Sequence, residues 1–158
     1  MTGLLVGALL LGLQTENVEC PATLLESINK SKLTFSNMEK FMSFQLKISG
    51  STRLHTVYLR KTSETYLSLT VNEVFGNFYD SPTKPSAETL MATFAKRYSI
   101  GGIIYELPSK TQPNYRMRYR MVVSSTATPR EVTESIQLVA GTADDLEAKF
   151  SGVKEDKL

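Results

Sequence analysis

Residues 115–150 read YRMRYRMVVSSTATPREVTESIQLVAGTADDLEAKF, and the spacing of their apolar side chains changes part-way along. Up to Val123, apolar and polar residues alternate, which is typical of a strand with one buried face. Residues 128–131, Thr-Pro-Arg-Glu, then supply the cap, proline and acid of a helix start. The apolar residues that follow recur every three or four positions and predict a helix that packs on a sheet for about 30 Å. They are Val132, Ile136, Val139, Ala143, Leu146 and Phe150.

Period-two alternation recurs in the residues before this stretch. It predicts strands at 41–49 and 54–61, a third strand marked by Leu67, Leu69 and Val71, and a fourth strand that begins at Ile103. Polar triplets predict the turns between them, including one at 62–64. Strands joined by such tight turns pair antiparallel.

Two shorter helices are predicted as well. Residues 23–26, Thr-Leu-Leu-Glu, have the pattern of a capping box, and the helix they start is expected to run to about Lys32. Ser86 is the expected cap of the other helix, and Gly101 and Gly102 lie where a helix end favours a positive φ. The apolar residues of that helix are Leu90, Met91, Phe94 and Tyr98.

The predicted order is α-β-β-β-α-β-β-α. It favours an α+β two-layer sandwich in which helices cover one face of a five-stranded antiparallel sheet. One domain is expected at 23–152, followed by a polar tail at 153–158. The expected core consists of Leu25, Ile28, Phe44, Leu46, Leu69, Phe94, Ile103, Tyr105, Met121, Ile136, Val139 and Leu146.

Residues 1–22 begin with the uncharged apolar run MTGLLVGALLLGL, which is far shorter than the ~20 residues that span a bilayer. The length suits the apolar region of a signal peptide with cleavage after Ala22, although no Lys or Arg precedes the run. This predicts an exported protein, periplasmic or secreted, that meets the membrane only through this segment before cleavage. The alternatives are a buried N-terminal helix or a start site placed too far downstream, and the protein is then expected in the cytoplasm.

The composition leaves few kinds of chemistry open. Among 158 residues there are one cysteine and one histidine, which excludes an intrachain disulfide, an iron–sulfur cluster and a multi-histidine metal site. The formal charge of +2 is too small to argue for nucleic acid. No hydrolase elbow or dinucleotide-binding glycine pattern occurs. We therefore expect no enzyme activity, no cofactor and no metal.

Two candidate sites are interpreted as ordinary surface. His55 lies on a predicted strand without a second histidine, so a surface or hairpin histidine is favoured over a general base. Asp144, Asp145 and Glu147 resemble an acidic metal cluster, but on a helix the first two point about 100° apart. A solvated polar face is the favoured interpretation.

Arg116, Arg118 and Arg120 are the clearest exposed feature. At period two the three guanidinium groups share one strand face and lie about 6.6 Å apart. The first interpretation is a solvent-facing side of the sheet whose arginines pair with acids on adjacent strands, with Glu106 as a candidate. The second is a docking site for an acidic protein, because guanidinium groups bind carboxylates in a bidentate manner. Nucleic acid or anionic lipid is a weaker alternative, and no nucleic acid is expected.

The order and spacing of the elements resemble the bacterial YbjN-domain family and the wider group that shares its architecture with type III secretion chaperones. The resemblance is carried by residues 23–29, 66–69, 90–94, 102–105, 128–132 and 143–147. It implies a non-enzymatic domain, often a dimer, that works by contacting other proteins, and it brings no catalytic residues. The chain departs from the secretion chaperones in being basic and in its predicted export.

Two functions follow as hypotheses. The first is a protein-interaction domain, chaperone-like or regulatory, that acts as a dimer on a partner whose identity the sequence does not specify. The second is an exported carrier that holds a lipid or another apolar ligand between sheet and helices. The flexible methionines suit either an adaptable pocket or an adaptable interface.

Overall fold

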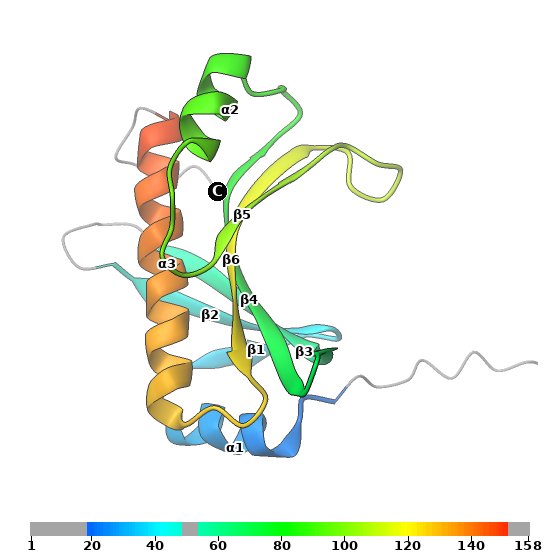
Figure 1. The fold of residues 1–158 in the computed structure, drawn as a ribbon, viewed down its shortest axis with the longest axis vertical. Coiled ribbons are helices and arrows are strands. Elements are labelled where there is room, and N and C mark those ends of the chain that lie inside the picture. The colour runs from blue at the N-terminus through cyan, green and yellow to red at the C-terminus, as the bar shows by residue number, and fades with distance from the viewer. Residues whose placement is uncertain (1–18, 49–53, 152–158) are drawn as a thin grey trace, which may run out of the picture.

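The computed structural model describes residues 19–48 and 54–151, which form three helices and six strands (Figure 1). In chain order these are α1 (Ala22–Lys30), β1 (Phe35–Asn37), β2 (Phe41–Lys47), β3 (Leu54–Tyr66), β4 (Leu69–Ser81), α2 (Ala87–Phe94), β5 (Gly102–Glu106), β6 (Tyr115–Ser124) and α3 (Pro129–Ser151).

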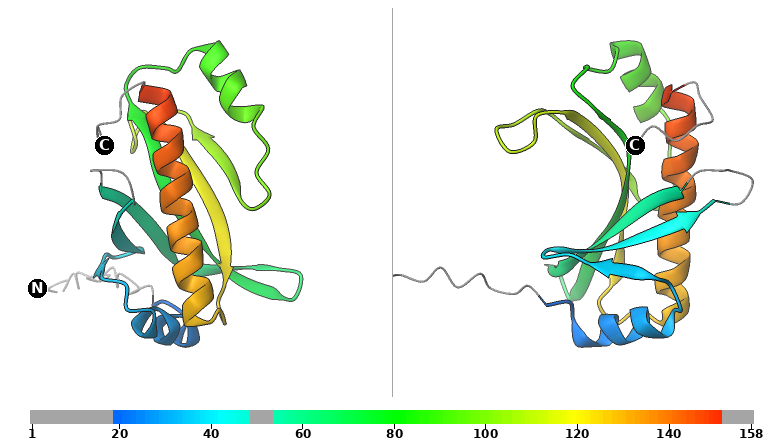
Figure 2. Two further views of the ribbon diagram at one scale, coloured as in Figure 1. Left: turned by 90° about the vertical axis from the view of Figure 1, so that its left-hand side faces the viewer. Right: turned by 180° about the vertical axis from the view of Figure 1, so that it is seen from behind.

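All six strands belong to one antiparallel sheet with the order β1-β2-β3-β4-β6-β5. The long helix α3 crosses one face of this sheet, while α1 lies at the lower end of α3 and α2 beside its upper end (Figures 1 and 2). The predicted α+β class with an antiparallel sheet is confirmed. The predicted five strands and their order are wrong, because β1 adds a strand before β2. At three residues, β1 is too short to show an alternating pattern.

The hairpin of β3 and β4 is longer than predicted. The turn expected at 62–64 is wrong, since the chain reverses at Leu67–Ser68 and residues 62–64 continue β3. The pairing of β3 with β4 shifts in register between Leu59 and Ser63, and the polar residues 62–64 lie at this irregularity within the strand. There the fully buried Asn72 donates from Nδ2 to the carbonyl oxygens of Arg60 and Lys61, at 3.0 and 3.1 Å. The side chain thus satisfies backbone groups that the irregular pairing leaves over.

The three helix starts differ in how they are capped. Thr128 and Glu131, the cap and acid predicted for the start of α3, form a capping box, since the Glu131 carboxylate accepts from the Thr128 backbone N–H at 2.7 Å. This hydrogen bond lowers the pKa of Glu131. Ser86 caps α2 as predicted. The capping box expected at Thr23 is wrong, because Pro21 is the N-cap of α1 and the Thr23 hydroxyl donates to the carbonyl of Ser125.

The ends of the two short helices were also predicted too far along. α1 ends at Lys30, and Lys32 already has a φ of 62°. α2 ends at Phe94, and the glycine with the positive φ, Gly101, lies just before β5.

The core lies between α3 and the sheet. The predicted stripe of α3 is confirmed, with Val132, Ile136 and Val139 fully buried against strand residues such as Phe44, Val57 and Val74. Two members of the expected core are wrong: Phe94 is 48% exposed on α2, and Leu69 is 65% exposed beside the hairpin turn. Both occupy the ends of elements, where few neighbours are available to cover them.

The segment before α1 contributes to this core. Cys20 is buried there, and burial raises the pKa of its thiol to about 11. The backbone N–H of Leu25 donates to the carbonyl of Pro21 at 2.9 Å. Cleavage after Ala22 would remove Cys20 and Pro21. Residues 1–18 of the expected signal peptide and the expected tail at 153–158 lie outside the described residues. Among the described helices, none is long and apolar enough to cross a membrane.

Candidate functional site

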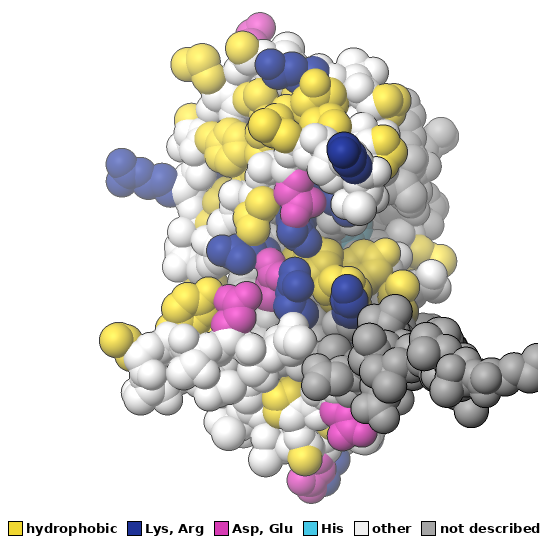
Figure 3. All heavy atoms as spheres, turned by 90° about the vertical axis from the view of Figure 1, so that its right-hand side faces the viewer, with side chains coloured by type: hydrophobic (Ala, Val, Ile, Leu, Met, Phe, Trp, Pro, Cys, Tyr) yellow, Lys and Arg dark blue, Asp and Glu magenta, His cyan; other side chains and the backbone are white. Residues whose placement is uncertain are grey.

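The sheet has a covered face, which packs on α3, and an open face on the opposite side. No helix of residues 19–48 and 54–151 lies over the open face (Figures 1 and 2). On β6, Met117 and Tyr119 are buried on the covered face. Arg116, Arg118 and Arg120 alternate with them and lie on the open face, as the sequence predicts. Charged side chains gather across the middle of this face, between apolar areas (Figure 3).

Two of the three arginines are held by acids of the neighbouring strands. Arg116 contacts Asp80 Oδ2 through both Nε and Nη2 at 2.8 Å. Asp80 also accepts a hydrogen bond from Asn114 at 2.7 Å. Arg118 pairs with Glu106, the partner proposed from the sequence, and its side chain is only 13% exposed. The interpretation of a sheet side with paired arginines is therefore confirmed for these residues.

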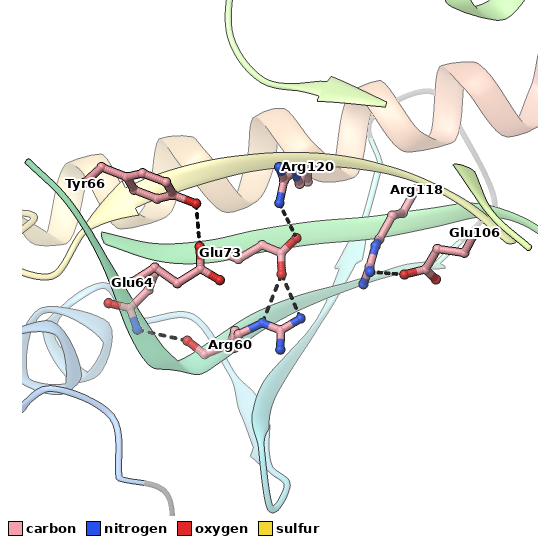
Figure 4. A network of polar contacts seen from close by, with 8 residues as sticks. Arg60, Glu64, Tyr66, Glu73, Glu106, Arg118 and Arg120 are labelled. Atoms are coloured by element: carbon pink, nitrogen blue, oxygen red, sulfur yellow. Dashed lines mark hydrogen bonds and ion pairs between the residues drawn. The ribbon is translucent and has the colours of Figure 1, made fainter. Parts of the chain in front are cut away.

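The third arginine, Arg120, shares its acid with Arg60 of β3 (Figure 4). Arg60 contacts Glu73 Oε2 through Nε at 3.0 Å and Nη2 at 2.9 Å. Arg120 Nη1 lies 3.4 Å from the other carboxylate oxygen, Oε1. Glu73 is buried while the Arg120 side chain is 44% exposed, the largest exposure in the row. Two guanidinium groups therefore share one buried carboxylate at this end of the row.

Aromatic rings lie beneath the charged groups, and the sequence analysis missed them. The ring of Phe75 stacks on Tyr58 at a centroid distance of 5.3 Å and meets Phe41 edge-on at 5.6 Å. Arg118 lies over Phe75 at 4.6 Å, and Arg60 over Phe41 at 5.4 Å. Such cation–π contacts fix the arginines on the sheet. In the alternation of β2, Phe41 shares a face with the polar residues Ser43, Gln45 and Lys47. An aromatic residue on that face indicates that the open face is partly apolar.

A hollow of about 370 Å³ adjoins Arg120, where β5 begins, and we call it the edge notch. It is lined by residues 100–104 and 120–122. Pairing of β5 with β6 starts at Gly102↔Arg120, so among the described strands residues 121–124 of β6 pair only with β4. Gly101, with a φ of 77°, makes this possible: a Cβ there would lie 2.4 Å from the carbonyl oxygen of Arg120. The chain turns away at this glycine and leaves the edge of β6 open.

Tyrosines border the site, and their surroundings affect their ionisation. The Tyr119 hydroxyl donates to the carbonyl of Ile100 behind the edge notch, and burial raises the pKa of Tyr119. The Tyr66 hydroxyl donates to Glu64 at 2.5 Å, and this hydrogen bond raises the pKa of Tyr66. Both groups are therefore protonated hydrogen-bond donors at neutral pH.

The interpretations of His55 and of the acids on α3 need correction. His55 is buried on the covered face, because β3 places it two residues before the core residue Val57. Asp144 and Glu147 are buried too, and only Asp145 is solvated as expected. His55 Nδ1 lies 3.8 Å from Glu147 Oε2. Within the described ranges, no three His, Cys, Asp or Glu side chains converge as metal ligands.

Comparison with protein-family models, with curated proteins and with solved structures found no match to this chain.

Proposed function

We propose that the protein is a non-catalytic protein-interaction domain that binds an acidic, extended segment of a partner protein on the open face, with Arg120 as the principal contact. The exposure of Arg120 carries the proposal. Its side chain is 44% exposed, and its guanidinium lies 3.4 Å from a carboxylate that Arg60 already holds at 2.9 Å. A carboxylate from a partner can therefore bind Arg120 without first breaking a close ion pair.

The edge notch supports an extended shape for the partner segment. Residues 121–124 of β6 pair with β4 on one side only, so their other edge is available for a further strand. Addition of a strand to such an edge is a common way to bind a peptide. Ile100 and Val122, each about half exposed, supply apolar walls beside Arg120. An acidic segment with alternating apolar residues would match both features.

Arg116 and Arg118 have a different part in this proposal. Their carboxylate contacts and, for Arg118, the stacking on Phe75 keep them in place on the sheet. Because Asp80 and Glu106 neutralise their charges, they contribute less than Arg120 to the binding of an acidic partner. The resemblance to YbjN-domain proteins and secretion chaperones, which act by contacting other proteins, supports the same class of function and extends the proposal to a dimer.

The alternative of a carrier for an apolar ligand receives no support from the packing. A ligand between α3 and the sheet would have to separate Ile136 and Val139 from Val57 and Val74, which are all completely buried. Native mass spectrometry tests this point directly, because a carrier is expected as a monomer with lipid bound and the proposed domain as a bare dimer.

The experiment is a fluorescence-anisotropy titration with a labelled peptide of alternating Val and Glu, and with matched peptides that carry Gln or Lys in place of Glu. We expect the wild type to bind the Glu peptide best, and binding to weaken as salt rises. Arg120→Gln should weaken this binding roughly tenfold, since a charge-assisted hydrogen bond is lost.

Arg116→Gln is the matched control, because Arg116 lies in the same row but is already engaged by Asp80 at 2.8 Å. It should alter the affinity much less than Arg120→Gln. Equal binding of the three peptides by the wild type, or equal losses in the two variants, would contradict the proposed site.

A further inference from the structure

A second hollow lies where the sheet divides, at a distance in sequence from the edge notch. β3 and β4 pair up to Val57↔Gly76 and then separate. Residues 54–56 of β3 continue to pair with β2, whereas residues 77–81 of β4 continue with β6. The two halves of the sheet diverge in a V in front of which α3 passes (Figure 2, left).

Close packing at Gly76 marks the point of division. A Cβ at this position would lie 3.1 Å from His55 Nε2 and 3.2 Å from the Ala143 Cβ. The glycine therefore lets His55 and α3 approach the sheet closely. One helical turn beyond Ala143, Glu147 of α3 lines the V on the side that the helix covers.

The space between the diverging strands, which we call the split cleft, has a volume of about 410 Å³. This falls within the range of small-molecule sites. Among its described lining residues, all but Leu54 have polar side chains, and they come from β3, β4, the segment before β6, and α3. The lining residues are Leu54, His55, Thr56, Tyr58, Asn77, Asp80, Asn114 and Glu147.

Two carboxylates and a buried amide oxygen line the split cleft. Glu147 lies at its back with a side chain only 4% exposed, and Asp80 is held in a fixed position by Arg116 and Asn114. Asn77 Oδ1 is buried and accepts no hydrogen bond from the residues that the structure describes. Buried acceptors of this kind normally have a donor. A molecule that fits must therefore bring N–H or O–H groups.

From these observations we infer that the split cleft is a binding site for a small hydroxylated amine, such as an amino sugar, whose ammonium group faces Glu147 and whose hydroxyl groups meet Asn77, Thr56 and Tyr58. A metal ion does not suit the lining, because no three ligands converge within residues 19–48 and 54–151. An anion is disfavoured because two carboxylates line the space. The inference does not require the proposed partner binding, although Asp80 and Tyr58 line the cleft and also contact Arg116 and Phe75 of the open face.

His55 is the one histidine of the sequence, so the imidazole proton signals of the protein without a histidine tag report on this cleft alone. The test is an NMR titration with glucosamine, glucose and glucuronate at constant pH. These probes share a hydroxylated ring and differ in charge. We expect glucosamine to shift the His55 signals saturably, glucose to shift them at higher concentration, and glucuronate to leave them unchanged.

Two variants and one control complete the test. Glu147→Gln should weaken glucosamine binding roughly tenfold or more, because a hydrogen bond between charged groups is lost, and Asn77→Ala about two- to tenfold. Glu134→Gln, an exposed acid on the same helix, should leave binding unchanged. If Glu147→Gln does not fold, Asn77→Ala decides the question. The inference is overturned if glucosamine gives no saturable shift, if glucuronate shifts the signals equally, or if the folded variants bind like the wild type.

Discussion

On β6, Met117 and Tyr119 face α3 and are buried, whereas Arg116, Arg118 and Arg120 of the same strand face outward and pair with carboxylates of β4 and β5. Burial of one large apolar side chain contributes about 1.5–3 kcal/mol, while an exposed ion pair contributes about 0–1 kcal/mol. The covered face therefore supplies most of the stability. The open face can then be altered, or can bind a partner, at little cost to the fold.

The largest effect is expected on the covered face. Ile136→Ala removes a completely buried side chain from the middle of α3 and should lower the free energy of unfolding by roughly 2–5 kcal/mol in urea denaturation. Leu138→Ala, two residues along the same helix at a side chain that is 40% exposed, is the control and should cost much less. A loss below about 0.5 kcal/mol for Ile136→Ala would mean that α3 does not bury this stripe.

An intermediate effect is expected where a polar side chain enters the covered face. Asn72→Ala leaves the carbonyl groups of Arg60 and Lys61 without their side-chain donor, which should cost about 1–3 kcal/mol. Ser63→Ala removes one hydrogen bond to Asn72 but keeps both carbonyl contacts, and should cost less. Hydrogen exchange of residues 59–63 would show whether the irregular pairing of β3 depends on Asn72. Equal stability of Asn72→Ala and wild type would contradict this account.

The smallest effect is expected on the open face. Arg120→Gln should change the free energy of unfolding by less than about 1 kcal/mol, because its contact with Glu73 is long, its own side chain is 44% exposed, and Arg60 still pairs with Glu73. Arg118→Gln should cost more, since Arg118 also packs on Phe75 at 4.6 Å. Thermal unfolding of the two variants under the same conditions shows which of them is the less stable. If Arg120→Gln proved the more destabilising, Arg120 would be structural, and its proposed docking role would lose its basis.

Local patterns predicted the parts of the fold that depend on neighbouring residues. The strand at Phe41, the stripe of α3, the caps at Ser86 and Thr128, and the outward position of the arginines all follow from period and cap chemistry. Glu106 was also identified as a partner for the row, because it lies on the strand expected to pair with β6.

Patterns misled where a polar residue is satisfied from far along the chain. Residues 62–64 read as a turn, yet they continue β3, and the hydroxyl of Ser63 hydrogen-bonds with Asn72 and Ser125. His55 and Glu147 read as surface residues because polar side chains are mostly exposed. They are 92 positions apart in the numbering of the sequence and meet only when α3 packs on the sheet.

Spacings within single elements were enough to predict the α+β class, the apolar face of α3 and the row of three arginines. The assembled fold alone showed that Glu73 is shared by Arg60 and Arg120, that Gly101 leaves the edge of β6 open, and that the sheet divides at Gly76. These three features have a common cause. Ion pairs, strand edges and cavities arise from the register and packing of segments distant in sequence, and no local spacing encodes them.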